Sequence, residues 1–176
     1  RAKLVKYEEI SDRIEYEIAS FLNAVSTEEI SVKTSYLIKA MYKIIGELES
    51  LGDSGESISR ILSRRNAHKK AFDAETIKKI NSMVDLVDKS YAAMIDNLIL
   101  IEKGELVEIS NAYSAEEQIN NQRNYLRDEE IENIDSGKKN YQTSVYYMDI
   151  VNELEKMGDF MINISQDLYK YKLKVS

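Results

Sequence analysis

The 176-residue chain contains no proline, and this absence constrains its fold more than any other feature. Proline ends or kinks a helix because it has no backbone N–H and its ring clashes with the preceding turn. Four of the six glycines also lie inside helix-periodic stretches, at positions 46, 52, 55 and 158. Because little interrupts long helices, the sequence predicts an all-α bundle.

Apolar residues recur at spacings of three and four along five segments, which predicts five long antiparallel helices. The predicted helices cover 2–25, a segment ending near 65, a segment with apolar positions from 77 to 101 that ends near 104, a segment ending near 137, and 138–171. Two start signals precede the second helix, a capping box of Ser26 with Glu29 and a lone Ser31, and the sequence does not choose between them. A capping box of Ser114 with Glu117 predicts the start of the fourth helix.

The composition excludes several classes of function. The formal net charge of −7 argues against nucleic acid as a partner, because affinity for phosphate backbones comes mainly from Lys and Arg. The chain has no Cys and a single His, His68, which excludes disulfides, thiol catalysis, zinc fingers and His-rich metal sites. No serine or lysine has a discernible activating partner, and no Gly-rich phosphate loop or Glu-x-x-His motif occurs. Only oxygen atoms remain as metal ligands, and we expect no enzymatic activity.

The longest apolar run, Leu98–Ile101, is far shorter than the roughly 20 residues that span a bilayer. No segment resembles a signal peptide, so the sequence predicts a soluble stretch. At 43% hydrophobic residues the chain can bury a core, and one domain over residues 1–176 is the simplest organisation. The first residue is Arg1 rather than Met, which is compatible with an excerpt of a longer polypeptide.

Two pairs of segments repeat within the chain. Residues 47–59 align with residues 153–165 at a shift of 106, with seven identities in thirteen positions. Residues 8–12 align with residues 116–120 at a shift of 108, and the turns absorb the difference of two. The economical interpretation is a duplication. The two repeats would cover residues 1–66, with two helices, and 67–176, with three.

Acidic residues spaced four apart form the strongest candidate site. They share a helix face, so two like charges repel and weaken the helix by a few tenths of a kcal/mol unless a cation lies between them. Three segments carry Glu-x-x-x-Asp, and a fourth has Asn in place of the Asp. The four pairs are Glu8 with Asp12, Glu49 with Asp53, Glu155 with Asp159, and Glu116 with Asn120.

Antiparallel hairpins would bring these pairs together, because facing residues have a constant index sum. The indices of Glu116 and Asp159, and those of Asn120 and Glu155, both sum to 275, which centres the turn beside Gly137. In the first hairpin the two acidic pairs share an index sum of 61, which centres the turn in the polar stretch after the first helix. Each hairpin is therefore predicted to face two acidic pairs across one helix contact.

Glycine lies beside the acidic pair in both repeated segments, as Gly52 and Gly158. Glycine in a helix interior costs about 1 kcal/mol relative to alanine, so its presence indicates close approach of a neighbouring helix, or of an ion with its waters. Carboxylates on facing helices are a common way for bundles to hold hard cations such as Mg, Mn, Ca or iron. The alternative is a solvated acidic edge. The predicted ligands of divalent or ferric metal ions are Glu8, Asp12, Glu49, Asp53, Glu116, Glu155 and Asp159.

These motifs resemble the PhoU-like family, whose hallmark is a helix carrying Leu-Glu-x-hydrophobic-Gly-Asp with a hydrophobic residue five positions further on. Residues 48–58 and 154–164 both fit. The segment 7–18 looks especially like the cytoplasmic PhoU-like domain that follows the membrane part of bacterial Na/phosphate cotransporters. The resemblance covers nearly the whole chain. It implies a PhoU-like helical bundle of two related three-helix repeats, whose Glu(Asp)-x-x-x-Asp motifs can carry multinuclear metal clusters.

The resemblance also implies a regulatory, non-catalytic domain of phosphate transport, cytoplasmic and at the inner face of the membrane. Its partner would be a membrane transporter, in the same or a separate chain. On chemical grounds alone, a bound metal would recruit phosphate as an extra ligand. The sequence leaves open whether the chain forms a homodimer. The first helix of repeat one is missing before Leu4, so it lies upstream, is disordered or is replaced by a partner chain. Asn120 stands where Asp would complete the second site, so that site is predicted to bind a cation more weakly than the first.

Other features have simpler interpretations. Residues 60–70 hold six basic residues and no acidic one, which we interpret as a solvated helix end, with docking on anionic lipid or on a transporter as the alternative. Tyr146 and Tyr147 are predicted to pack in the bundle with their hydroxyls at the rim rather than to stack on a ligand. His68 is predicted to be exposed.

Two other functions compete with the regulatory one. A carboxylate-bridged di-iron oxidase is disfavoured because histidine ligands are absent. A metal-free helical interaction module would use the acidic pairs to bind a basic partner or to keep the surface soluble.

Overall fold

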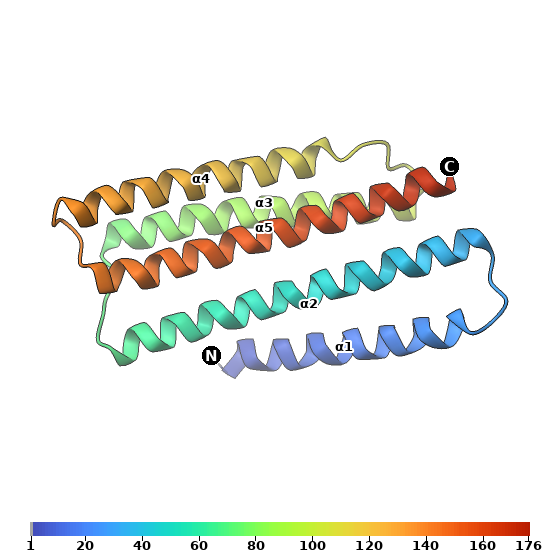
Figure 1. Cartoon of the computed structure of the whole chain (residues 1–176), viewed down its shortest axis with the longest axis horizontal. Coiled ribbons are helices and arrows are strands. Elements are labelled where there is room, and N and C mark those ends of the chain that lie inside the picture. Colours follow the sequence, from blue (N-terminus) through green and yellow to red (C-terminus); the bar gives the residue numbers. More distant parts are fainter. Residues whose placement is uncertain (1) are drawn as a thin grey trace.

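The computed structural model describes the backbone of residues 2–176 and the side chains of residues 6, 7 and 9–176. These residues form five helices and no strand, which confirms the all-α prediction (Figure 1). No helix in this part of the chain is both long and apolar enough to cross a membrane. The helices are α1 (Ala2–Ser26), α2 (Val32–Ala67), α3 (Ala74–Glu102), α4 (Ser110–Asp135) and α5 (Tyr141–Val175).

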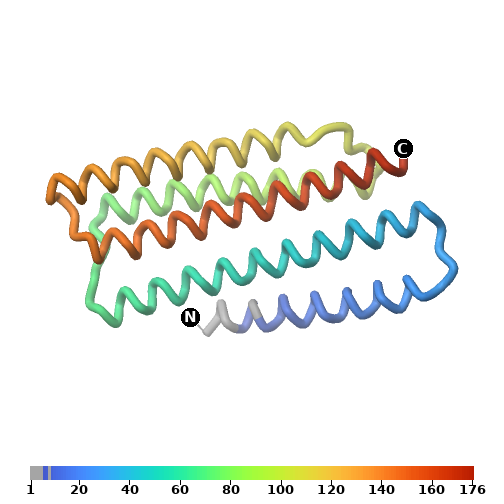
Figure 2. Tube along the Cα trace, in the orientation of Figure 1, coloured from blue at the N-terminus to red at the C-terminus, as the bar shows by residue number. Residues whose placement is uncertain are grey.

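Helix α5 is the centre of the bundle. It packs against α2, α3 and α4, and α3 also packs against α4. Over the range that the structure describes, α1 contacts α2 and no other helix. The antiparallel α1–α2 hairpin therefore lies along one side of the α3–α4–α5 group and is joined to it through α2 (Figure 2).

The hydrophobic core has two parts, which follow from this arrangement. The main cluster is formed by the inward faces of α3, α4 and α5, and Ile61 of α2 belongs to it. Its side chains include Met83, Val151 and Ile164, which are fully buried. A smaller cluster joins α1 to α2 through Leu22 and its neighbours. The α3–α4–α5 group thus buries most of the apolar surface that stabilises the fold.

The start of α2 follows the second of its two predicted signals. Ser31 is the N-cap, and its hydroxyl accepts a hydrogen bond from the backbone N–H of Thr34 at 3.1 Å. Helix α5 begins at Tyr141, three residues later than predicted, because the side chain of Asn140 accepts hydrogen bonds from the first-turn N–H groups.

The predicted start of α4 was wrong. The helix begins at Ser110, so the Ser114–Glu117 capping box lies inside it. The N-cap residue is Ile109, which has no side-chain cap but is 3% exposed and belongs to the main core. The burial of Ile109 and Ala112 stabilises an additional first turn, which outweighs the missing polar cap.

The two motif glycines, Gly52 and Gly158, each face a neighbouring helix, which was one of the two explanations considered for their presence inside helices. A Cβ atom built on Gly158 would lie 2.8 Å from Cδ1 of Ile119 on α4, and one built on Gly52 would lie 3.5 Å from Oγ of Ser11 on α1. A side chain at position 158 would therefore require Ile119 of α4 to move. Gly52 has room for a methyl group.

Replacing Gly158 with alanine is expected to destabilise the protein by about 1 kcal/mol. The gain in helix propensity is outweighed because the added methyl overpacks the buried Ile119 side chain. The matched control is Gly46→Ala on α2, where a Cβ would meet nothing within 4 Å. It should stabilise by about 0.5–1 kcal/mol. Urea unfolding measures both, and equal stabilisation by the two variants would contradict the close approach.

Candidate carboxylate sites

Helices α1 and α2 place a group of acidic side chains along their contact, here called the first carboxylate cluster. It consists of Asp12 and Glu15 on α1 and Glu49 and Asp53 on α2. Asp12, Glu49 and Asp53 are predicted site residues, whereas Glu15 was missed by the sequence reasoning. Its signal was present, because Glu15 follows Asp12 by three residues and so shares its face of the helix. The side chain of Glu8, the remaining predicted ligand, lies outside the described residues.

The negative charges of the first carboxylate cluster repel one another when no cation is bound. Partial burial raises the pKa of Glu49, and the negative charges of Asp53, Glu15 and Asp12 raise it further. None of the four forms an ion pair with a Lys or Arg among the side chains that the structure describes. A cation at this contact would relieve the repulsion.

Helices α4 and α5 carry the second carboxylate cluster. It consists of Glu116 and Asn120 on α4 and Glu155 and Asp159 on α5. Burial raises the pKa of Asp159, and the charges of Glu155 and Glu116 add to the effect. The side-chain amide of Asn120 donates a hydrogen bond to Glu116. All four residues are half-buried.

Arg123 distinguishes the second cluster from the first, and sequence reasoning missed it. Its guanidinium Nη2 donates to Oε1 of Glu155 at 2.7 Å, and its positive charge offsets part of the rise in the pKa of Asp159. Arg123 follows Asn120 by three residues on α4, so helix periodicity could have found it. The second cluster therefore already contains a positively charged side chain, whereas the first has none that pairs with it among the described side chains.

The structure does not gather the clusters into a formed metal site. Among residues with described side chains, no three Asp, Glu or His side chains lie close enough to hold one ion. Carboxylates from both helices of each hairpin nevertheless interact electrostatically, so side chains would have to rotate to ligate a cation. Oxygen ligands of this kind suit hard cations such as Mg²⁺, Ca²⁺ or Mn²⁺.

The tyrosine and histidine predictions had different outcomes. His68 is exposed as predicted, and its Nδ1 contacts the hydroxyl of half-buried Tyr146. Tyr147 contradicts the prediction of a hydroxyl at the rim, because it is 1% exposed and its hydroxyl is buried without a hydrogen-bond partner among the described residues. Burial raises the pKa of Tyr147, so it stays protonated. The periodic packing of α5 against α3 and α4 draws the whole ring into the core.

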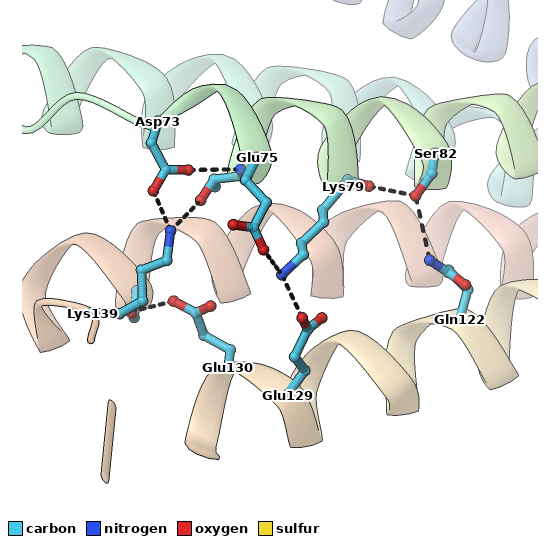
Figure 3. Close-up of polar contacts among 10 residues, drawn as sticks. Asp73, Glu75, Lys79, Ser82, Gln122, Glu129, Glu130 and Lys139 are labelled. Carbon is cyan, nitrogen blue, oxygen red and sulfur yellow. Dashed lines mark hydrogen bonds and ion pairs between the residues drawn. The ribbon is translucent and has the colours of Figure 1, made fainter. Parts of the chain in front are cut away.

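A polar network at one end of the bundle ties α3 to α4 and to the turn before α5 (Figure 3). Lys79 lies between Glu75 of its own helix, at 2.8 Å, and Glu129 of α4, at 2.9 Å. Lys139 pairs with Asp73, the N-cap of α3, and its hydrogen bond holds the pKa of that carboxyl well below its ordinary range. These contacts hold the start of α3 against α4 and against the turn before α5.

Comparisons with known protein families, with curated proteins and with solved structures gave no match.

Proposed function

We propose that this chain is a non-catalytic, regulatory helical module of phosphate transport. In this proposal it is a PhoU-like domain of two related repeats, located in the cytoplasm at the inner face of the membrane. It acts by docking on a membrane transporter, which is either part of the same polypeptide or a separate protein. No bond is broken, and the signal is the binding of an ion or of phosphate.

The observation that carries the proposal is the matching arrangement of the two motif helices. Gly52 of α2 faces α1, and Gly158 of α5 faces α4, in two antiparallel hairpins. Beside each glycine, carboxylates from both helices of the hairpin interact electrostatically. This pairing of related motifs on related hairpins supports the resemblance on which the regulatory function rests.

The first carboxylate cluster is the proposed cation site. Asp12, Glu49 and Asp53 would supply oxygen ligands, with Glu15 close by and with Glu8 as a predicted further ligand. The cation would neutralise the repulsion that raises the pKa of Glu49. A hard metal ion held there supplies open coordination positions for a phosphate oxygen, which would connect metal binding to phosphate.

A metal-free interaction module is the second candidate, and Arg123 favours it. An arginine that already neutralises part of one cluster shows that this chain can balance its facing carboxylates without metal. In that case the acidic face of the first cluster would bind a basic surface of the partner.

The double variant Glu49→Gln, Asp53→Asn separates the two candidates. Under the proposal it abolishes the uptake of Mg²⁺, Mn²⁺, Ca²⁺ or Fe³⁺ by EDTA-treated protein, measured by calorimetric titration and elemental analysis. It also removes the metal-dependent part of phosphate binding. The matched control is Glu28→Gln, Glu29→Gln in the exposed α1–α2 turn, which removes the same charge. If the wild-type protein takes up no metal, or if both variants bind alike, the proposed cation site is wrong.

The same variant has an expected effect on stability without metal. The folded-state pKa of Glu49 is raised, so its negative charge costs stability at neutral pH, and this cost is lost as the pH falls through the raised pKa. At pH 7 the variant should therefore be more stable than the wild type by a few tenths of a kcal/mol. The advantage should shrink toward pH 4, which thermal unfolding at the two pH values would measure.

A further inference from the structure

A cleft lined by residues of α2, α4 and α5 is not used by the proposed cation site. It has a volume of about 970 Å³ and lies between the C-terminal third of α2 and the N-terminal half of α5, with Arg123 of α4 at one edge. Pockets of about 300–1,000 Å³ are the size that proteins use for small-molecule ligands. The cleft is therefore large enough for an organic molecule of moderate size.

The lining of this cleft has one more basic than acidic side chain. Four cationic side chains line it, Arg60, Arg64, Arg123 and Lys156, against three acidic ones. A net positive cleft is unexpected in a chain whose net charge is −7. The cations are spaced so that several can act on one ligand, because Arg60 and Arg64 are four residues apart on one helix face.

Two of the three acidic groups are already neutralised. Glu155 pairs with Arg123 at 2.7 Å, and Glu153 pairs with Lys156 at 2.9 Å. Arg60 pairs with Glu56, which lies outside the lining, and Arg60 remains exposed. Arg64 forms no ion pair with any side chain that the structure describes. Arg60 and Arg64 can therefore turn their guanidinium groups toward an anion.

The cleft continues into a second hollow of about 630 Å³, which shares Arg64 and Asp149 with it. This hollow adds Lys70, His68 and Tyr146. The two hollows, here together called the groove, thus share Arg64, with Arg60 in the first hollow and Tyr146 and His68 in the second. Asp149 is the remaining acidic group, and it lines both hollows without an ion pair in the described part of the chain.

We propose that this groove binds a small molecule that carries two or more phosphate groups, with Arg60 and Arg64 as its main contacts. Arginine suits this role because its planar guanidinium donates two parallel hydrogen bonds to phosphate oxygens and is always charged. Several phosphates, rather than one, match a groove in which cations follow one another along α2. A membrane surface fits less well, since Arg123 is recessed, with 25% of its side chain exposed.

The proposal is independent of the proposed cation site, and the experiment separates the two. EDTA-treated protein is titrated with inorganic pyrophosphate, tripolyphosphate and ATP, at matched ionic strength, by isothermal calorimetry. Orthophosphate and sulfate are the single-anion comparisons. Saturable binding of the polyphosphates without metal, at least tenfold tighter than that of orthophosphate, is the expected result. ATP binding tighter than tripolyphosphate would assign a role to the aromatic end of the groove.

Three variants test the residues. Arg60→Gln, Arg64→Gln should weaken pyrophosphate binding at least tenfold, whereas Lys33→Gln, Lys103→Gln, with the same change in charge outside the groove, should leave it unchanged. Asp149→Asn should tighten binding severalfold, because it removes an unpaired negative charge from the lining. Tighter binding by Asp149→Asn could not be explained by misfolding of the variant.

Three outcomes would overturn the proposal. The first is no saturable binding of any polyphosphate. The second is equal weakening by the groove and control variants, which would indicate non-specific attraction. The third is binding to phosphatidylglycerol vesicles that depends on Arg60 and Arg64 without any binding of the soluble polyphosphates, which would assign the surface to lipid instead.

Discussion

Replacing Lys79 with methionine is expected to destabilise the protein by about 2 kcal/mol. Lys79 is 16% exposed and is the only described cation that joins Glu75 to Glu129 across the α3–α4 contact (Figure 3). Burial by itself lowers the pKa of Lys79, but its hydrogen bonds to Glu129 and Glu75 outweigh burial, so the pKa is raised. Methionine fills similar space but leaves Glu129 without its partner. Breaking a buried pair costs about 3–5 kcal/mol, and the exposure of Glu75 reduces that figure here.

Chemical denaturation of Lys79→Met and of Lys78→Met measures this effect. Lys78 is the exposed neighbour on the same helix, so its replacement should change stability by less than about 0.5 kcal/mol. The double variant Lys79→Met, Glu129→Leu should recover much of the loss, because two apolar side chains replace the ion pair. A double variant no more stable than Lys79→Met would show that the ion pair is not the source of the effect.

Replacing Asn97 with aspartate is expected to cost about 3 kcal/mol at pH 7. Asn97 is 1% exposed, and its amide nitrogen donates to Oδ1 of Asn111 at 3.2 Å and to the hydroxyl of Ser165 at 3.1 Å. This small network joins α3, α4 and α5. Aspartate removes the donor and places a charge in the core, so burial raises the folded-state pKa of the new carboxyl.

The sign of the pH dependence identifies the cause. Because the folded-state pKa is raised, the destabilisation is present at neutral pH and decreases as the pH falls through that value. Unfolding of Asn97→Asp at pH 7 and at pH 4, each relative to the wild type, measures the change. Asn124→Asp on the exposed face of α4 is the control. A loss of stability that is the same at both pH values would point to the missing donor alone.

The helices could be predicted because nothing in the chain competes with helical periodicity. The absence of proline and the apolar spacing placed the ends of α1 and α3 within two residues of those observed. The start of α4 could not be predicted in this way. The Ser114–Glu117 pair matches a capping box, but the burial of Ile109 and Ala112 against α3 and α5 begins the helix earlier. A capping motif in the sequence carries no information about burial of residues such as Ile109 in the tertiary structure.

For the candidate sites, the sequence predicts which helices carry the carboxylates but not which other side chains reach them. Index sums predict that Glu116 lies opposite Asp159, and the charge of Glu116 contributes to the raised pKa of Asp159. The sums could not predict Arg123, because its guanidinium reaches Glu155 through a long side chain that does not follow backbone register. The groove of Arg60 and Arg64 was visible in the sequence only as a basic run, since its walls come from residues of α2 and α5 far apart in the chain.

Within the described residues, α1 packs against α2 and no other helix, which has a consequence for local opening. Free energies of local opening follow the buried contacts that must be lost, so residues 9–26 can undock at a lower cost than any part of α5. A cation held by Asp12, Glu49 and Asp53 would bind only the docked arrangement. By mass action the cation would then shift the population toward the docked state of α1. The ion concentration would thus determine how much of the time the surfaces between α1 and α2 are exposed to solvent.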